Sequence, residues 1–256
     1  MTRHLSRTHL HSSAFVQVLA DLAGLDTSRP PGDFADRLAQ WIHIADAIAL
    51  RATHTAVPPA NQDSPNKKPS EQAQQVCAHF ASQRDALQSA IRNGGTGTTY
   101  GKAALPRPKR GTPAELLGSY EPYKRYYIAH QRELELKIKP LRAKIRAAVA
   151  SHSARLHQLA ALDAALESTL EEREAMLLAK TPTLMERRFR QLRQSHADAL
   201  AQAALEDNPD LWIQPGGWLT RFAEEIQNVL LAELDLRLQP TMGLLEALDN
   251  EIPLLS

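Results

Sequence analysis

The sequence predicts an all-α protein, with an N-terminal helical hairpin followed by long, kinked, coiled-coil-like helices that pack as an elongated bundle. Two observations predict this class. The chain has 256 residues, of which 43% are hydrophobic and only 5% aromatic, and it favours Ala, Leu, Glu, Gln and Arg, which form helices readily. Apolar residues also recur at spacings of three and four, the period of helices that bury one face. A chain of this length can bury a sizeable core.

The predicted N-terminal hairpin occupies residues 1–56. Its first helix begins at Ser12 or Ser13, whose hydroxyl can accept a hydrogen bond from a free backbone amide, and runs to about Leu25. A Pro-Pro-Gly turn follows, and Asp33 caps the second helix. The buried stripe of this second helix has spacings of three or four throughout and consists of Phe34, Leu38, Trp41, Ile42, Ala45, Ile48 and Ala52.

Two linkers and one helix connect the hairpin to the rest of the chain. Residues 57–70 hold four prolines among polar residues and are predicted to form a flexible linker. Residues 71–92 follow as a single helix. Residues 93–112 are a basic loop rich in Gly and Pro, which we expect to be disordered. The apolar stripe of the single helix consists of Val76, Phe80, Leu87 and Ile91.

Residues 113–256 are predicted to form a long helical, coiled-coil region. Between Pro122 and Lys180 the helical pattern is almost uninterrupted, and Pro140 must kink or split this helix because a proline removes a backbone donor. Spacings of three and four alternate here over about six heptads, which is typical of a coiled-coil seam. The seam consists of Leu134, Ile138, Leu141, Ile145, Ala148, His152, Leu156, Leu159, Asp163, Leu166, Leu170, Arg173 and Leu177.

Three positions of this seam are polar, namely His152, Asp163 and Arg173. A polar residue in a seam commonly fixes the register or the number of partners, at some cost in stability. Alternatively, these side chains lie at the rim of the seam and stay hydrated. The sequence leaves both interpretations open.

Two further helices are predicted toward the C-terminus. The first covers about residues 184–205, and the second covers residues 217–238 after a turn at 208–217. Pro240 is expected to separate a short terminal helix from the second one. The buried stripe of the second helix consists of Phe222, Ile226, Val229, Leu230, Leu234 and Leu238.

The charge is balanced overall but unevenly distributed. The net charge is +1, yet residues 102–146 hold twelve basic and four acidic side chains, and residues 206–256 hold ten acidic and two basic ones. Solvated helix faces commonly carry such runs. Alternatively, the two oppositely charged segments attract each other, within one chain or between two chains.

We predict that the basic run faces the acidic C-terminal helix, in cis or across a dimer, and that the apolar seam supplies the affinity. The predicted interaction residues of the seam are Leu134, Ile138, Leu141, Ile145, Leu156, Leu159, Leu166 and Leu170. The predicted charged partners are Lys137, Lys139, Arg142, Lys144 and Arg146 on one side and Glu224, Glu225, Glu233 and Asp235 on the other.

No motif in the sequence indicates catalysis, so we predict a protein that is not an enzyme and needs no cofactor. The Gly-rich stretch at 94–102 lacks the glycine spacing and the Ser or Thr after Lys102 that a phosphate-binding loop requires. The ten histidines include no His-Glu-x-x-His pair, so no metal site is expected. The single cysteine, Cys77, fits a small core residue.

One segment favours an alternative function. Tyr120, Tyr123, Tyr126 and Tyr127 lie among basic residues at the start of the basic run. Aromatic rings can stack on bases while cations hold phosphates, so segment 120–146 is a candidate for nucleic-acid binding. Tyrosines at this spacing also commonly pack against a neighbouring helix.

The sequence predicts a cytoplasmic protein without membrane insertion. No run approaches the ~20 apolar residues that a spanning helix needs. The basic start before Ala14–Ala20 is similar to a signal peptide, but Gln17 and Asp21 interrupt its apolar stretch, and the same stretch forms an amphipathic helix.

Two stretches carry a resemblance to a known family. One is Ser12–Leu22 with Phe34–Trp41 and Asp46–Ile48, and the other is Leu231–Pro240 with Gly243 and Leu244. They resemble a proteobacterial family of largely helical proteins that is known as a domain of unknown function. The resemblance implies no catalytic residue. It implies one partner class, because the family tends to be encoded beside proton-driven, stator-type membrane proteins with long cytoplasmic coiled coils.

The leading hypothesis is therefore a non-enzymatic helical scaffold or adaptor. It would act by coiled-coil self-association or by docking to another coiled-coil protein, including as an accessory of a stator-like membrane complex. Binding of nucleic acid through residues 120–146 is the alternative.

Overall fold

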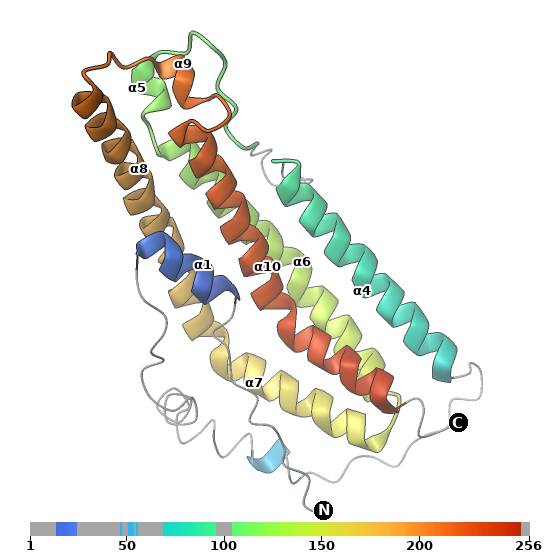
Figure 1. Ribbon diagram of the computed structural model, residues 1–256. Coiled ribbons are helices and arrows are strands. Elements are labelled where there is room, and N and C mark those ends of the chain that lie inside the picture. Colours follow the sequence, from blue (N-terminus) through green and yellow to red (C-terminus); the bar gives the residue numbers. More distant parts are fainter. Residues whose placement is uncertain are drawn as a thin grey trace, which may run out of the picture.

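The computed structural model describes residues 14–24, 47, 51–53, 55, 69–95 and 104–251, and it confirms the all-α class within them (Figure 1). A single antiparallel bridge between Gly95 and Ala104 is the only strand-like pairing in these residues. The caps at Ser12 and Ser13, the stripe from Phe34 to Ile48 and nearly all of the linker 57–70 lie outside the described residues. The helices are α1 (Ala14–Ala23), α4 (Pro69–Arg92), α5 (Ala114–Leu117), α6 (Glu121–Ala150), α7 (Ala154–Leu178), α8 (Thr181–Ala203), α9 (Pro209–Trp212) and α10 (Trp218–Glu251).

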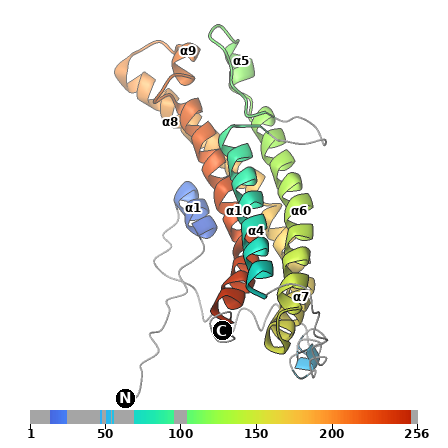
Figure 2. The same ribbon diagram turned by 90° about the vertical axis from the view of Figure 1, so that its right-hand side faces the viewer.

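The long helices form an elongated bundle around α10. Helices α4, α6 and α10 run side by side (Figures 1 and 2). Helix α7 packs mainly against α6 at one end of the bundle. The chain then turns into α8, which packs against α10 toward the other end. Helix α1 lies across α8 and α10, while α5 and α9 close one end of the bundle. This arrangement leaves one side of α7 at the surface.

Helix α10 continues through Pro240, so the prediction of a separate terminal helix is wrong. A proline inside a helix costs ~3 kcal/mol. The apolar stripe, however, continues beyond it on the same face, and each buried leucine contributes about 1.5–3 kcal/mol. Burial of the distal half against the bundle therefore outweighs the lost hydrogen bond. The buried residues beyond the proline are Thr241, Leu244, Leu245 and Leu248.

The predicted helix between Pro122 and Lys180 is two helices, and the break does not fall at Pro140. Pro140 lies inside α6 with its ring exposed. The helix ends at Ala150, where the Ser151 amide donates to the Ala147 carbonyl. Ser153 then caps α7 by accepting a hydrogen bond from the Leu156 amide at 3.1 Å. The predicted seam is thereby divided between two helices of a hairpin.

An aromatic cluster fills the end of the core near α5 and α9. Phe189 of α8 and Phe222 of α10 have ring centroids 5.0 Å apart in an edge-to-face arrangement, and Tyr123 of α6 lies 5.3 Å from Phe222. The Tyr120 hydroxyl donates to the Pro182 carbonyl at 2.7 Å. The cluster joins α6, α8 and α10 at the point where their stripes converge.

The two described parts of the loop 93–112, residues 93–95 and 104–112, contact each other and the bundle, while residues 96–103 lie outside the described residues. The Leu105 amide donates to the Gly94 carbonyl at 2.6 Å, and the Leu105 side chain is buried. Gly94 has a φ of +70°, and a Cβ at this position would lie 3.0 Å from the Leu105 Cβ, so a glycine is required. Gly111 donates to Asp210 of α9 at 2.8 Å.

We expect Phe222→Ala to lower the free energy of unfolding by about 3–5 kcal/mol, because it removes a fully buried ring from the centre of the aromatic cluster. Leu116→Ala is the matched control, since Leu116 is an exposed apolar residue. Chemical denaturation followed by circular dichroism measures both. Equal effects of the two substitutions would contradict the proposed role of the cluster.

Candidate protein-docking surface

Four charged side chains hold α7 against α6. Arg142 of α6 forms a two-pronged contact with Asp163 of α7, from Nε to Oδ2 at 3.2 Å and from Nη2 to Oδ1 at 2.5 Å. Arg146 donates from Nε to the same Asp163 at 2.8 Å and also pairs with Glu167. The side chains of Arg142 and Asp163 are only 12% exposed. We call these four residues the hairpin cluster.

The main effect of the hairpin cluster is to fix the register of α7 against α6, and its net contribution to the free energy of folding is small. Burial lowers the pKa of the Arg146 guanidinium, but the hydrogen bonds that it donates to Glu167 and Asp163, together with the attraction of their charges, more than offset this, so its pKa lies above the ordinary value. The Coulombic gain of a buried pair is largely cancelled by desolvation, whereas loss of one partner leaves a poorly solvated charge. The exposed pair of Lys139 and Glu171 beside the cluster contributes little.

The structure places the predicted charge partners differently from the sequence-based expectation. Helices α6 and α10 do pack together, but the arginines of the basic run pair with α7. Lys137 pairs with Glu133 one turn away, and Lys144 contacts His79 of α4. On α10, Glu224 and Asp235 are exposed. The remaining predicted acids pair elsewhere: Glu225 with Arg188 and Arg221, and Glu233 with Arg237.

The α6 half of the predicted seam belongs to the core. Its four large apolar residues are buried inside the bundle, and Leu156 at the start of α7 is buried with them. These positions are therefore not available to an outside partner. The four residues are Leu134, Ile138, Leu141 and Ile145.

The α7 half of the seam lies at the surface. Leu159 is 36% exposed and Leu177 is 52% exposed, while Leu166 and Leu170 between them are half-buried. Arg173 is half-buried in the same row, and no ion pair or hydrogen bond joins it to another residue in the described part of the chain. We call the row Leu159, Leu166, Leu170, Arg173 and Leu177 the α7 flank.

The neighbouring, buried face of α7 fixes the orientation of this flank. Ala160 and Leu178 are buried against the bundle, and Asp163 of the hairpin cluster lies at the edge between the buried face and the flank. The cap residue Ser153 also donates to Glu251 of α10 at 2.9 Å. Helix α7 is thus held at its start and along one face, and the flank is presented in a set orientation.

A second polar centre, around Glu233 of α10, is buried and fully occupied. Its carboxylate accepts hydrogen bonds from the Tyr127 hydroxyl, the Gln131 amide and the Arg237 guanidinium. Burial, together with the neighbouring Glu233 charge, raises the pKa of Tyr127 well above its ordinary value. Gln131 also donates to the Leu178 carbonyl at the end of α7. This centre joins α6, α7 and α10 and leaves no free group for chemistry.

His130 of α6 is a buried titratable group beside the core. Its ring lies 4.6 Å from the Tyr126 ring in an edge-to-face arrangement, and its side chain is almost completely inaccessible. Burial lowers the pKa of His130 to about 4, even though the nearby Glu133 carboxylate acts in the opposite direction. His130 is therefore neutral near pH 7 and behaves as a core residue.

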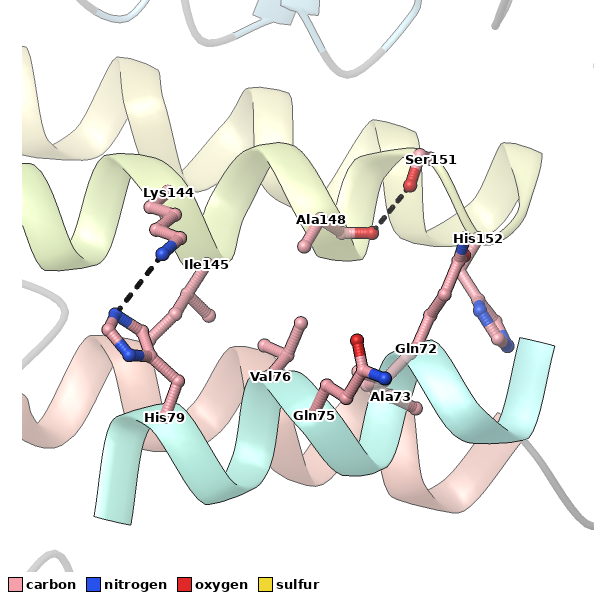
Figure 3. Close-up of a pocket in the computed structure, with 11 residues that line it drawn as sticks. Gln72, Ala73, Gln75, Val76, His79, Lys144, Ile145, Ala148, Ser151 and His152 are labelled. Carbon is pink, nitrogen blue, oxygen red and sulfur yellow. Dashed lines mark hydrogen bonds between the residues drawn. The ribbon is translucent and has the colours of Figure 1, made fainter. Parts of the chain in front are cut away.

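A cavity of about 420 Å³ lies between α4, α6 and α10 (Figure 3). Apolar side chains, among them Val76, Ile145 and Leu248, form part of its wall, and polar side chains such as Gln72 and Gln75 form the rest. The Lys144 Nζ lies 3.4 Å from His79 Nε2 across the space. Among the described residues, no group of three or more His, Cys, Asp or Glu side chains is placed to hold a metal ion.

The four tyrosines of the basic segment are core residues. All are buried, with Tyr126 and Tyr127 completely inaccessible. Their rings are therefore not available to stack on bases, which removes the aromatic part of the nucleic-acid hypothesis. Within the described residues no helix has both the length and the apolar character to cross a bilayer.

Comparison with known proteins gives a family but no activity. The family model described as "Protein of unknown function (DUF3348)" matches residues 1–250. No curated protein and no solved structure matches the chain. The surface geometry must therefore supply the argument for function.

Asp163→Asn is expected to lower the free energy of unfolding by about 1–3 kcal/mol, because it leaves two partly buried guanidiniums with only Glu167 as a counter-charge. The matched control is Glu171→Gln, which removes an exposed ion pair on the same helix and should leave the free energy of unfolding almost unchanged. Urea denaturation measures both values. A similar small effect for both substitutions would show that the hairpin cluster does not hold α7.

Stability should fall as the pH drops from about 6.5 to about 4, partly because of His130. Its folded-state pKa of about 4 lies below the ordinary value of 6.5, so in this window the unfolded chain binds a proton that the folded chain excludes. In His130→Gln this contribution disappears, and the difference in stability between pH 7 and pH 4 should shrink by about 2–3 kcal/mol. Urea midpoints at several pH values test this; parallel pH profiles for the two proteins would refute it.

Proposed function

The chain belongs to the DUF3348 family, and we propose that it is a non-enzymatic helical scaffold that docks a helix of another protein chain on the α7 flank. The bundle supplies a rigid support. The flank supplies an apolar, heptad-spaced surface that a second helix can cover by coiled-coil packing.

The observation that carries this proposal is the exposure of the α7 flank. Leu159 and Leu177 are exposed on a helix whose other face is buried, and the residues between them keep the alternating spacing of a seam. Single exposed leucines are ordinary on protein surfaces. A continuous row at heptad spacing is different, because one partner helix can cover all of it at once.

The fixed orientation of α7 supports the same proposal. The hairpin cluster and the Ser153 cap hold the helix before any partner arrives. A partner therefore does not have to order this helix when it binds, and more of the apolar burial contributes to affinity. A structural role alone would not require the row of leucines on the outer side.

Two classes of partner fit a heptad-spaced surface. One is a second copy of this chain. The other is a separate coiled-coil protein, and the resemblance to the proteobacterial family adds the cytoplasmic coiled coil of a stator-type membrane complex as a specific member of this class. The alternative function, nucleic-acid binding through residues 120–146, has less support because the tyrosines are buried and Arg142 and Arg146 are already paired.

The double substitution Leu159→Gln with Leu177→Gln tests the docking surface. We expect it to abolish concentration-dependent association in light scattering, or to remove the protein captured from native lysate by the wild-type chain. The melting temperature should stay within about 2 °C, because both side chains are exposed.

The matched control is Leu116→Gln with Leu205→Gln, which changes two exposed leucines outside α7. The control should behave as the wild type in both assays. If the α7 double variant keeps the same mass and the same captured protein as the control, the α7 flank is not a docking surface and the proposal is wrong.

A further inference from the structure

We propose that the α7 flank pairs with the α7 flank of a second copy in antiparallel orientation, about a two-fold axis that passes beside residue 168. In this pairing Asp163 of each copy faces Arg173 of the other. The inference rests on the proposed function, and it names the partner and the register.

The residue pattern of α7 has mirror symmetry about residue 168. Leu159 and Leu177 are equally distant from this point, and so are Leu166 and Leu170. In an antiparallel pair each residue faces the residue at the mirrored position of the other copy. Leucines therefore meet leucines at both ends and on both sides of the axis. The heptad assignment agrees, because every mirrored pair combines an a position with a d position, as antiparallel packing requires.

The two polar positions select this orientation. Asp163 and Arg173 are also mirrored about residue 168, so the antiparallel pair places opposite charges opposite each other twice. A parallel, in-register pair would place Asp163 against Asp163 and Arg173 against Arg173, which is repulsive. Charge complementarity therefore favours an antiparallel second copy over a parallel one.

Arg173 and Asp163 can both take part in an ion pair between two copies. Arg173 has no ion pair with any other described residue and lies half-buried beside the leucines of the α7 flank, so its charge is available to an acidic partner. Asp163 lies at the edge of the flank, and although it binds Arg142 and Arg146, carboxylate oxygens accept several hydrogen bonds. The pairing is isologous, so the same surface of both copies is covered and the assembly closes as a dimer.

Engineered disulfides test the orientation directly. The variants Leu159→Cys and Leu177→Cys are made separately in the Cys77→Ser background. In the antiparallel register the two positions face each other, whereas two copies of Leu159 lie ~27 Å apart along the helix axis. Mild oxidation should therefore give a cross-linked dimer when the two variants are mixed, and none when either is oxidised alone.

A charge substitution tests the register. Arg173→Glu in both cysteine variants places Glu opposite Asp163 and should reduce cross-linking in the mixture about tenfold or more. Arg155→Glu is the control, because residue 155 is an exposed arginine of α7 whose mirrored position, 181, lies beyond the end of the helix. The control should cross-link as before, and the melting temperatures of both should match the parent.

The outcomes separate this inference from the proposed function. Cross-linking of either variant with itself would overturn the antiparallel register, because it requires a parallel pair. No cross-link in the mixture, with a monomeric mass at every concentration, would exclude the second copy as partner. The proposed function would then be decided by the capture experiment with Leu159→Gln and Leu177→Gln, which does not depend on self-association.

Discussion

Burial of the apolar stripe of α10 is the constraint on which the rest of the structure depends. Helices α1, α4, α6, α7, α8 and α9 all contact α10, so its 34 residues present apolar side chains over much of the helix surface. Burial of this stripe is large enough to carry the helix through Pro240, and it decides which face each neighbouring helix must turn inward. The surface properties of α7 follow from this, because only its inner face reaches the core.

Buried charge supplies the register that apolar burial lacks. Hydrophobic packing is non-directional, whereas Glu233 accepts hydrogen bonds from α6 and α10 residues at defined positions. Asp163 does the same for α6 and α7 through two arginines. A one-turn shift of α7 along α6 would separate Asp163 from both arginines, and a one-turn shift of α6 along α10 would take Tyr127 and Gln131 away from Glu233. Each carboxylate would then lose hydrogen-bond partners at a site with little access to water, which is costly. The apolar stripe of α10 therefore holds the helices together, and the polar centres around Glu233 and Asp163 fix their register.

The class of the fold, the stripe of α4 and the stripe of α10 could be predicted from the sequence, because burial of a helix face leaves a period of 3.6 residues. The break between α6 and α7 at residues 151–153 could not be predicted from the sequence. Ser153 is a good cap, but a serine inside a helical pattern is a weak signal unless the fold opposes continuation. The seam spacing changes here only by two successive fours, from Ala148 to His152 and from His152 to Leu156, which a continuous helix also tolerates. The charge partners were mispredicted for a related reason: net charge along a segment does not say which helix lies alongside, and only the hairpin brings Asp163 to Arg142 and Arg146.

The hairpin also explains why one seam has two roles. Spacing is identical on both sides of the turn, but α6 is packed among α10, α4 and α7, whereas the described helices that α7 mainly contacts are α6 and α10. The same heptad pattern is therefore core in one helix and surface in the next. Asp163 takes part in both roles, because it binds the two arginines of α6 and also lies at the edge of the α7 flank. A partner helix that supplies a cation at this edge would share the Asp163 carboxylate with Arg142 and Arg146, so closure of the hairpin and docking on it would be coupled through one carboxylate.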